Sequence, residues 1–256
     1  MKINAQNIER IFRFSVLGLI AISGASAIAA PTLVYVHEES IVNAGTSYLG
    51  LPLLQSNGSV SYQIWDVYVG SFNIGVSTTI SGSVTNELAF CVDPWNWSGS
   101  GTMPYLQQNL TQVVTSQSST FDIQQLAVHE SRISALYSND YQDTIGNTEK
   151  SAAFQIALWE IVSDNAVSEV GNSNSKIWND GEALLSQLES SNFKMGSQNY
   201  DITAYYVQRD QPGYQTLGQN YLVATPVPEP ATLALLSVGL AGISMTWRKK
   251  TVAVTK

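Results

Sequence analysis

Two short apolar segments, one near each end of the chain, limit the part that can fold as a soluble domain to residues 30–225. The first, Phe14–Ile22, follows three basic residues and precedes small residues at positions 25–30. This order is typical of a secretory signal peptide, which we assign to residues 1–29. The second, residues 231–247, has no charged side chain and is near the lower length limit for a transmembrane helix. The chain is therefore expected to leave the cytoplasm.

The residues around the second apolar segment form an ordered pattern over residues 226–256. Pro228, Glu229 and Pro230 precede the apolar run, and Arg248, Lys249 and Lys250 follow it. A basic cluster of this kind stays on the cytoplasmic side, which leaves the body of the protein outside. The pattern resembles the PEP-CTERM sorting signal, which is found mainly in Gram-negative bacteria that make exopolysaccharide.

The resemblance implies two partners, the secretion machinery and exosortase, a membrane protease that cuts near residues 228–230. It also implies a location. The C-terminal helix would anchor the protein in the inner membrane before processing, and the product would reach the cell surface or the extracellular matrix. Exopolysaccharide is a further candidate partner. A plain C-terminal membrane anchor is the alternative interpretation.

The charge of the region between the two ends restricts its partners. Acidic side chains are in large excess in this region. It contains only five basic ones: Arg132, Lys150, Lys176, Lys194 and Arg209. A surface of this kind does not favour nucleic acid. It also repels anionic membranes and polymers unless divalent ions intervene. We expect no nucleic-acid partner.

Hydrophobic periodicity predicts an α+β domain, mainly a β sandwich or barrel-like structure with an inserted helical subdomain. The predicted strands are Thr32–Val36, Ser59–Val69, Phe72–Ile80, Leu88–Val92, Tyr200–Gln208 and Tyr221–Ala224. Irregular structure is expected from about residue 37 to 58, a break or bulge at Gly70, and a loop over residues 94–104. The predicted helices are Phe121–Tyr137, Ser151–Ser163 and Gly181–Ser190, the second with its cap near Asn147–Thr148.

Cys91 is the only cysteine of the chain, so no intrachain disulfide can form. It lies in the segment Ala89–Asp93, and Gln155 lies downstream in Phe154–Trp159. An aromatic–Cys–aliphatic segment followed by an apolar–Gln–x–x–apolar–Trp segment resembles the paired signature of bacterial thioester adhesin domains. In that family, cysteine and glutamine condense with loss of ammonia. The resemblance assigns this pair to Cys91 and Gln155. Phe90, Phe154, Trp159 and Trp95 are expected to keep water out of the pocket.

The same resemblance implies a function, that of an exported adhesin of the cell surface or exopolysaccharide matrix. A nucleophile on a surface or matrix partner would attack the Gln155 carbonyl, and Cys91 would leave. The protein would act as an electrophile used once, not as an enzyme, and it would need no cofactor and no metal. Asp93 and Glu160 flank the pair and are candidates for proton transfer.

Two other functions fit the same residues. Cys91 could act with His129 as a thiol hydrolase or a transglutaminase-like enzyme, although helical spacing predicts that His129 is exposed, opposite the apolar residues. Alternatively, Cys91 is simply buried, as free cysteine often is, and the protein is a structural or carbohydrate-binding matrix protein. In that case Trp95 and Trp97 would stack on sugars.

Metal sites receive little support from the sequence. Two histidines and one cysteine cannot build a usual zinc site. Asp140 and Asp143 are candidates for calcium ligands, but a solvated loop is the preferred interpretation of this region.

Overall fold

The computed structural model describes residues 30–54, 60–94, 101–113, 126–164, 167–169, 175–190, 196, 199–207 and 218–227. The described residues from Pro31 onward belong to one compact unit. The predicted signal peptide, Trp95, Trp97 and the sorting signal from Pro228 onward, with its transmembrane helix, lie outside these residues. Within the described part of the chain, no helix has both the length and the apolar character needed to cross a membrane.

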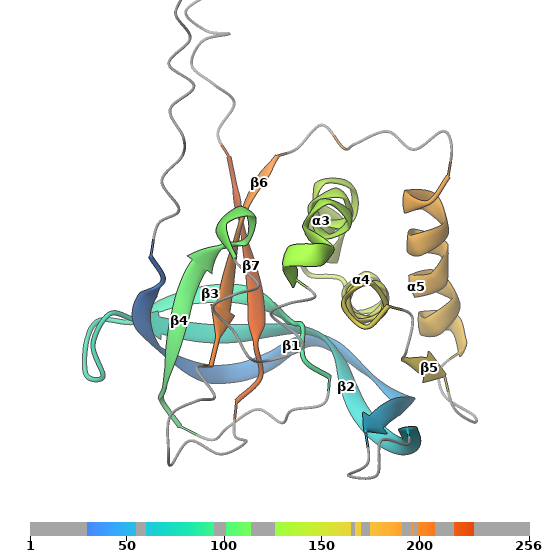
Figure 1. Cartoon of the computed structure of the whole chain (residues 1–256), viewed down its shortest axis with the longest axis horizontal. Coiled ribbons are helices and arrows are strands. Elements are labelled where there is room, and N and C mark those ends of the chain that lie inside the picture. The colour runs from blue at the N-terminus through green and yellow to red at the C-terminus, as the bar shows by residue number, and fades with distance from the viewer. Residues whose placement is uncertain are drawn as a thin grey trace, which may run out of the picture. The chain divides into compact units, whose positions relative to one another are not determined.

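The core of the fold is an antiparallel sheet whose hydrogen-bonded neighbours form a closed ring (Figure 1). The strands are β1 (Thr32–Leu54), β2 (Val60–Ser77), β3 (Thr85–Cys91), β4 (Met103–Asn109), β6 (Tyr200–Tyr206) and β7 (Tyr221–Pro226). Around the ring they follow the order β1, β2, β3, β7, β6, β4 and back to β1, and the short β5 (Ser168–Glu169) pairs with the edge of β1. The predicted α+β class with mainly antiparallel strands is confirmed.

The long hairpin of β1 and β2 differs from the prediction. Residues 37–58 were expected to be irregular, but β1 continues to Leu54 and pairs with β2 along nearly its whole length. The predicted interruption at Gly70 is also absent, since β2 continues through this residue. The β-bulge at this point lies on β1, where Asn43 is the extra residue. A Cβ atom on Gly70 would lie 2.5 Å from the Asn43 carbonyl oxygen, and the φ angle of Gly70 is 147°. Glycine is therefore required where the bulge crosses the partner strand.

Between β4 and β6, the described residues form helices that lie together beside the sheet (Figure 1). They are α3 (Glu130–Thr144), α4 (Thr148–Val162) and α5 (Ser175–Leu188), and a short 3₁₀ turn, η2 (Leu110–Gln112), follows β4. The predicted cap of α4 is confirmed, since the Asn147 side chain accepts a hydrogen bond from the Lys150 N–H, and the helix begins at Thr148, before the predicted Ser151. The predicted end of the first helix is wrong. Because α3 continues to Thr144, Asp140 and Asp143 lie on a helix and not in a solvated loop.

Two buried clusters share the strands between them. Successive side chains of β3 point to opposite faces, so Phe90 and Val92 belong to the cluster that packs against α3 and α4. Ala89 and Cys91 belong to the second cluster, on the face that the ring encloses. Helix α4 contributes side chains to both clusters and is buried along almost its entire length. It is therefore the element that joins the ring to the helical layer.

Candidate functional site

The Gln155 side chain pairs with the backbone of Cys91. The Cys91 N–H donates to Gln155 Oε1 at 3.0 Å, and Gln155 Nε2 donates to the Cys91 carbonyl oxygen at 2.6 Å. Both residues are fully buried. The last strand residue of β3 and the middle of α4 therefore meet through two hydrogen bonds, across 64 positions of sequence. These two residues are the pair that the sequence nominated.

A second buried contact holds α4 against the sheet one helical turn earlier. Ser71 of β2 donates its N–H to Ser151 Oγ at 2.9 Å, and the two hydroxyl groups are 3.2 Å apart. Ser71 Oγ also donates to the Val42 carbonyl oxygen. Because Ser151 and Gln155 are four residues apart, they lie on the same side of the helix. The sequence analysis did not identify either serine, although the four-residue spacing from Gln155 was visible in the sequence.

The Cys91 sulfur has a donor of its own. The Asp93 N–H lies 3.3 Å from Cys91 Sγ and donates to it. Opposite Cys91 in the ladder is Tyr221, whose ring belongs to the same buried cluster. The Tyr221 hydroxyl group donates a hydrogen bond to the Glu38 carboxylate. Burial, together with Tyr105 and Glu38, raises the pKa of this hydroxyl group far above its ordinary value. It therefore stays protonated at physiological pH.

The predicted shielding residues occupy two different places. Phe90 and Phe154 pack against each other with ring centroids 4.5 Å apart and ring planes tilted by 45°, in the cluster that faces the helices. Trp159 belongs instead to the cluster that contains Cys91, and it lies one helical turn after Gln155. All three side chains are buried. Apolar side chains thus cover the strand on both faces around the Cys91–Gln155 contact, whereas Trp95 lies outside the described residues.

His129 is engaged elsewhere. The prediction of an exposed histidine is wrong, because only 11% of its side chain is exposed and its Nε2 atom lies 2.8 Å from Asp164 Oδ1. Asp164 comes just after the C-terminal end of α4, and Gln155 lies about 10 Å back along the helix axis from that end. The His129 imidazole is therefore oriented by Asp164, beyond the end of α4. The side chain that the fold brings to Cys91 is instead that of Gln155.

The two carboxylates that flank the pair in sequence differ in position. Asp93 lies two residues after Cys91, is fully buried and supplies the N–H donor to the sulfur. Glu160 lies five residues after Gln155, which places it roughly 140° around the helix. It lines a pocket between α4 and α5 instead. Burial, and to a lesser extent Glu182, raises the pKa of Glu160 to about 8.

The aspartates considered for calcium lie three residues apart on α3. Burial, followed by repulsion from Asp143, raises the pKa of Asp140. Among the described residues, no group of three or more His, Cys, Asp or Glu side chains is arranged to hold a metal ion.

The C-terminal end of the chain matches the PEP-CTERM protein-sorting motif over residues 226–250. The match supports the predicted export and exosortase processing, with transient membrane anchoring before cleavage. No match was found among curated proteins. Because the matched motif covers only the sorting segment, the function of residues 30–225 is inferred from the geometry described above.

Proposed function

We propose that Cys91 and Gln155 form an internal thioester, and that the protein is a surface or matrix adhesin that bonds covalently to its partner. The observation that supports this proposal best is the buried pair of hydrogen bonds between the Gln155 carboxamide and the Cys91 backbone. These two hydrogen bonds hold the Gln155 side chain at the residue that carries the sulfur. The adhesin role further draws on the sorting motif at residues 226–250.

The hydrogen bonds suit the first chemical step. Attack of Sγ on the Gln155 carbonyl carbon forms the carbon–sulfur bond and places negative charge on Oε1. The Cys91 N–H already donates to this atom, as an oxyanion donor does. The carbon–nitrogen bond then breaks, and Nε2 leaves as ammonia with the thiol proton.

The second step transfers the acyl group to a partner. An amine attacks the Gln155 carbonyl, an amide bond forms, and the carbon–sulfur bond breaks. Cys91 leaves as a thiolate, which the Asp93 N–H stabilises and which then takes up the proton lost by the amine. The reaction occurs once per molecule, and burial protects the bond from hydrolysis until the partner arrives.

The proposal is tested by the intact mass of the exported protein. We expect a mass that is lower than the sequence mass of the exported protein by one ammonia. The variants Cys91→Ala and Gln155→Ala should each have the full mass expected from their sequence. Gln108→Ala is the matched control, because Gln108 is also a buried, hydrogen-bonded glutamine. This variant should keep the deficit. Methylamine should add its mass to the native protein and release one thiol that can be alkylated.

A structural matrix protein with an inert Cys91 is the second candidate, and one observation favours it. Gln155 uses both ends of its carboxamide in hydrogen bonds to backbone, as a purely structural glutamine would. This candidate predicts a full mass and immediate alkylation of Cys91 in the unfolded protein. Such a result would exclude the thioester but not the surface location.

A further inference from the structure

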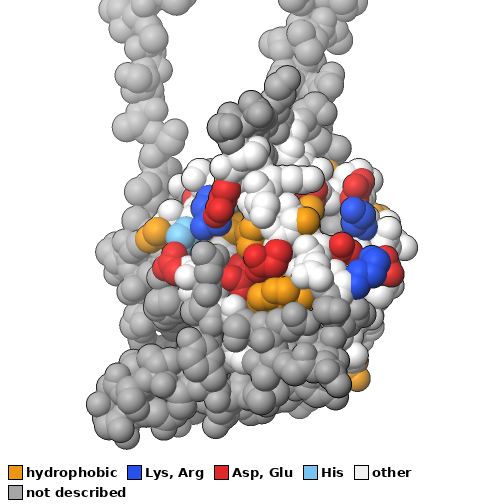
Figure 2. All heavy atoms as spheres, turned by 90° about the vertical axis from the view of Figure 1, so that its right-hand side faces the viewer, with side chains coloured by type: hydrophobic (Ala, Val, Ile, Leu, Met, Phe, Trp, Pro, Cys, Tyr) orange, Lys and Arg blue, Asp and Glu red, His pale blue; other side chains and the backbone are white. Residues whose placement is uncertain are grey.

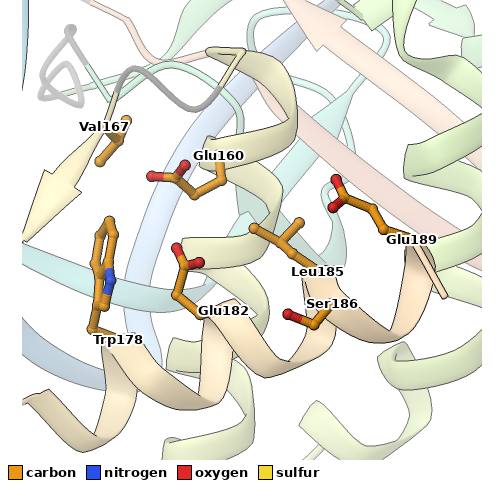
Figure 3. A pocket seen from close by; sticks show the side chains of 7 residues that line it. All are labelled: Glu160, Val167, Trp178, Glu182, Leu185, Ser186 and Glu189. Carbon is orange, nitrogen blue, oxygen red and sulfur yellow. The ribbon is translucent and has the colours of Figure 1, made fainter.

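A pocket of about 330 Å³ lies between α4 and α5, away from the Cys91–Gln155 contact. Its wall includes Glu160 from α4, Trp178 and Glu182 from α5, and Glu189, which follows the C-terminal end of α5 (Figure 3). The face of the molecule shown in Figure 2 carries acidic side chains gathered next to hydrophobic ones. The pocket therefore combines an aromatic surface with several carboxylates.

Glu160 is the unusual member of this group. Only 3% of the residue is exposed, and its Oε1 atom has no hydrogen-bond partner within the described part of the chain. Figure 3 shows its carboxylate directed into the pocket, with the carboxylate of Glu182 nearby. A buried carboxylate without a partner is costly, and natural proteins seldom keep one unless a ligand or ion completes it.

The acidic side chains of the pocket are not balanced by basic ones among the described residues. Glu189 is paired with Arg132 of α3, with 2.9 Å between the guanidinium nitrogen and the carboxylate oxygen. Asp164, just beyond the C-terminal end of α4, is paired with His129. Among the described residues, no cation pairs with Glu160 or Glu182. One positive charge placed between these two carboxylates would complete the pocket.

We propose that this pocket binds a protonated alkylamine, such as a lysine side chain, with the ammonium group between Glu160 and Glu182 and the alkyl chain against Trp178. An ammonium group offers three donors to carboxylates, and an indole face attracts organic cations. A metal ion fits less well, because the described residues contain no group of three ligating side chains arranged for one. The proposal is independent of the thioester, since Glu160 lies on another side of α4.

Calorimetric titration of the exported protein with Nα-acetyl-lysine methylamide tests the proposal. Saturable binding to the wild type is expected, with affinity reduced about tenfold or more in Glu160→Gln, the loss typical of a charged hydrogen bond. Trp178→Leu should weaken binding as well. Glu149→Gln is the matched control, because it removes the same charge from the exposed part of α4 and should bind as the wild type does.

The pH dependence of binding offers a second readout that a surface attraction would not give. Since burial raises the pKa of Glu160 to about 8, the empty pocket holds this group mainly protonated at neutral pH. A bound ammonium group favours the carboxylate, so binding releases a proton and affinity rises with pH until about pH 8. Lysine itself stays protonated over this range. In Glu160→Gln this pH dependence should disappear.

Three outcomes would overturn the proposal. The first is equal affinity of the wild type for the uncharged analogue Nα-acetyl-norleucine methylamide. The second is unchanged affinity for the lysine derivative in Glu160→Gln with a native circular dichroism spectrum. The third is binding of Ca²⁺ that depends on Glu160 together with no binding of the lysine derivative, which would assign the pocket to a metal.

Discussion

Gln155 and Glu160 are both buried polar side chains of α4, but their surroundings are opposite. Gln155 faces the sheet, and each end of its carboxamide is hydrogen-bonded to the Cys91 backbone. Glu160 faces α5, and its buried Oε1 atom has no hydrogen-bond partner among the described residues. One helix thus presents a satisfied polar group on one side and an unsatisfied one on another.

This difference separates two kinds of role. A satisfied buried group holds the fold together, and here it also holds a carboxamide against the backbone of Cys91. An unsatisfied buried group reduces stability and is retained where a ligand supplies the missing partner. Removing the first should therefore destabilise the protein, whereas removing the charge of the second should stabilise it.

The largest expected effect is that of Gln155→Leu, made in a Cys91→Ala background so that no cross-link contributes. Leucine has a similar size but removes both hydrogen bonds between this side chain and the backbone at position 91. We expect a loss of roughly 2–6 kcal/mol in the free energy of unfolding, measured with urea. A loss below about 1 kcal/mol would mean that these hydrogen bonds are replaced by others.

Ser151→Ala should have a smaller effect of the same sign. It leaves the Ser71 N–H without its acceptor and removes the contact between the two hydroxyl groups. The expected loss is about 1–3 kcal/mol in urea unfolding. Ser134→Ala is the control, since the partly buried Ser134 hydroxyl donates to Glu130 of the same helix and not to the sheet. Equal losses of unfolding free energy in both variants would contradict a larger contribution of the Ser71–Ser151 contact.

Glu160→Gln should change stability in the opposite direction, and only above acidic pH. Because the folded-state pKa of about 8 lies above the unfolded value, the wild type loses stability as pH rises from about 4.5 to 8. The glutamine variant avoids this loss. Its melting temperature should therefore exceed that of the wild type by an amount that grows over this range and is constant at higher pH. A constant difference at all pH values would contradict the assignment.

The smallest effect is expected for Lys176→Met. Lys176 contacts Glu149 and Asp180 at the exposed surface, where water and salt screen such pairs. The melting temperature should change little, and the change should vanish at high salt. A large loss would show that this surface ion pair contributes more than the buried contacts of α4.

Local sequence patterns predicted α4 well but β1 poorly. Helix α4 carries its own signals, a capping asparagine and an apolar stretch from Ala152 to Val162 that only Gln155 and Glu160 interrupt. Strand β1 contains Glu38, Glu39, Asn43 and Gly45, which disfavour a strand by propensity. Its extended form follows from pairing with β2, which lies later in the chain. This contribution of tertiary pairing is not visible in a local window.

The candidate site shows a similar limit. The resemblance named Cys91 and Gln155, and the fold brings these residues together. Periodicity did not reveal that the carboxamide would pair with backbone atoms, or that Ser71 would meet Ser151. His129 was misplaced because its partner, Asp164, lies at the end of the next helix. Contacts between distant segments depend on the register of the sheet, which local patterns do not specify.

The central claim is tested most directly by locating the bond in peptides. The exported protein is digested under acidic conditions after unfolding, and the fragments are analysed by tandem mass spectrometry. The account predicts one joined species that contains the Cys91 and Gln155 peptides, with a mass equal to their sum less one ammonia. Two separate peptides, with a free thiol on Cys91 and an intact carboxamide on Gln155, would contradict it.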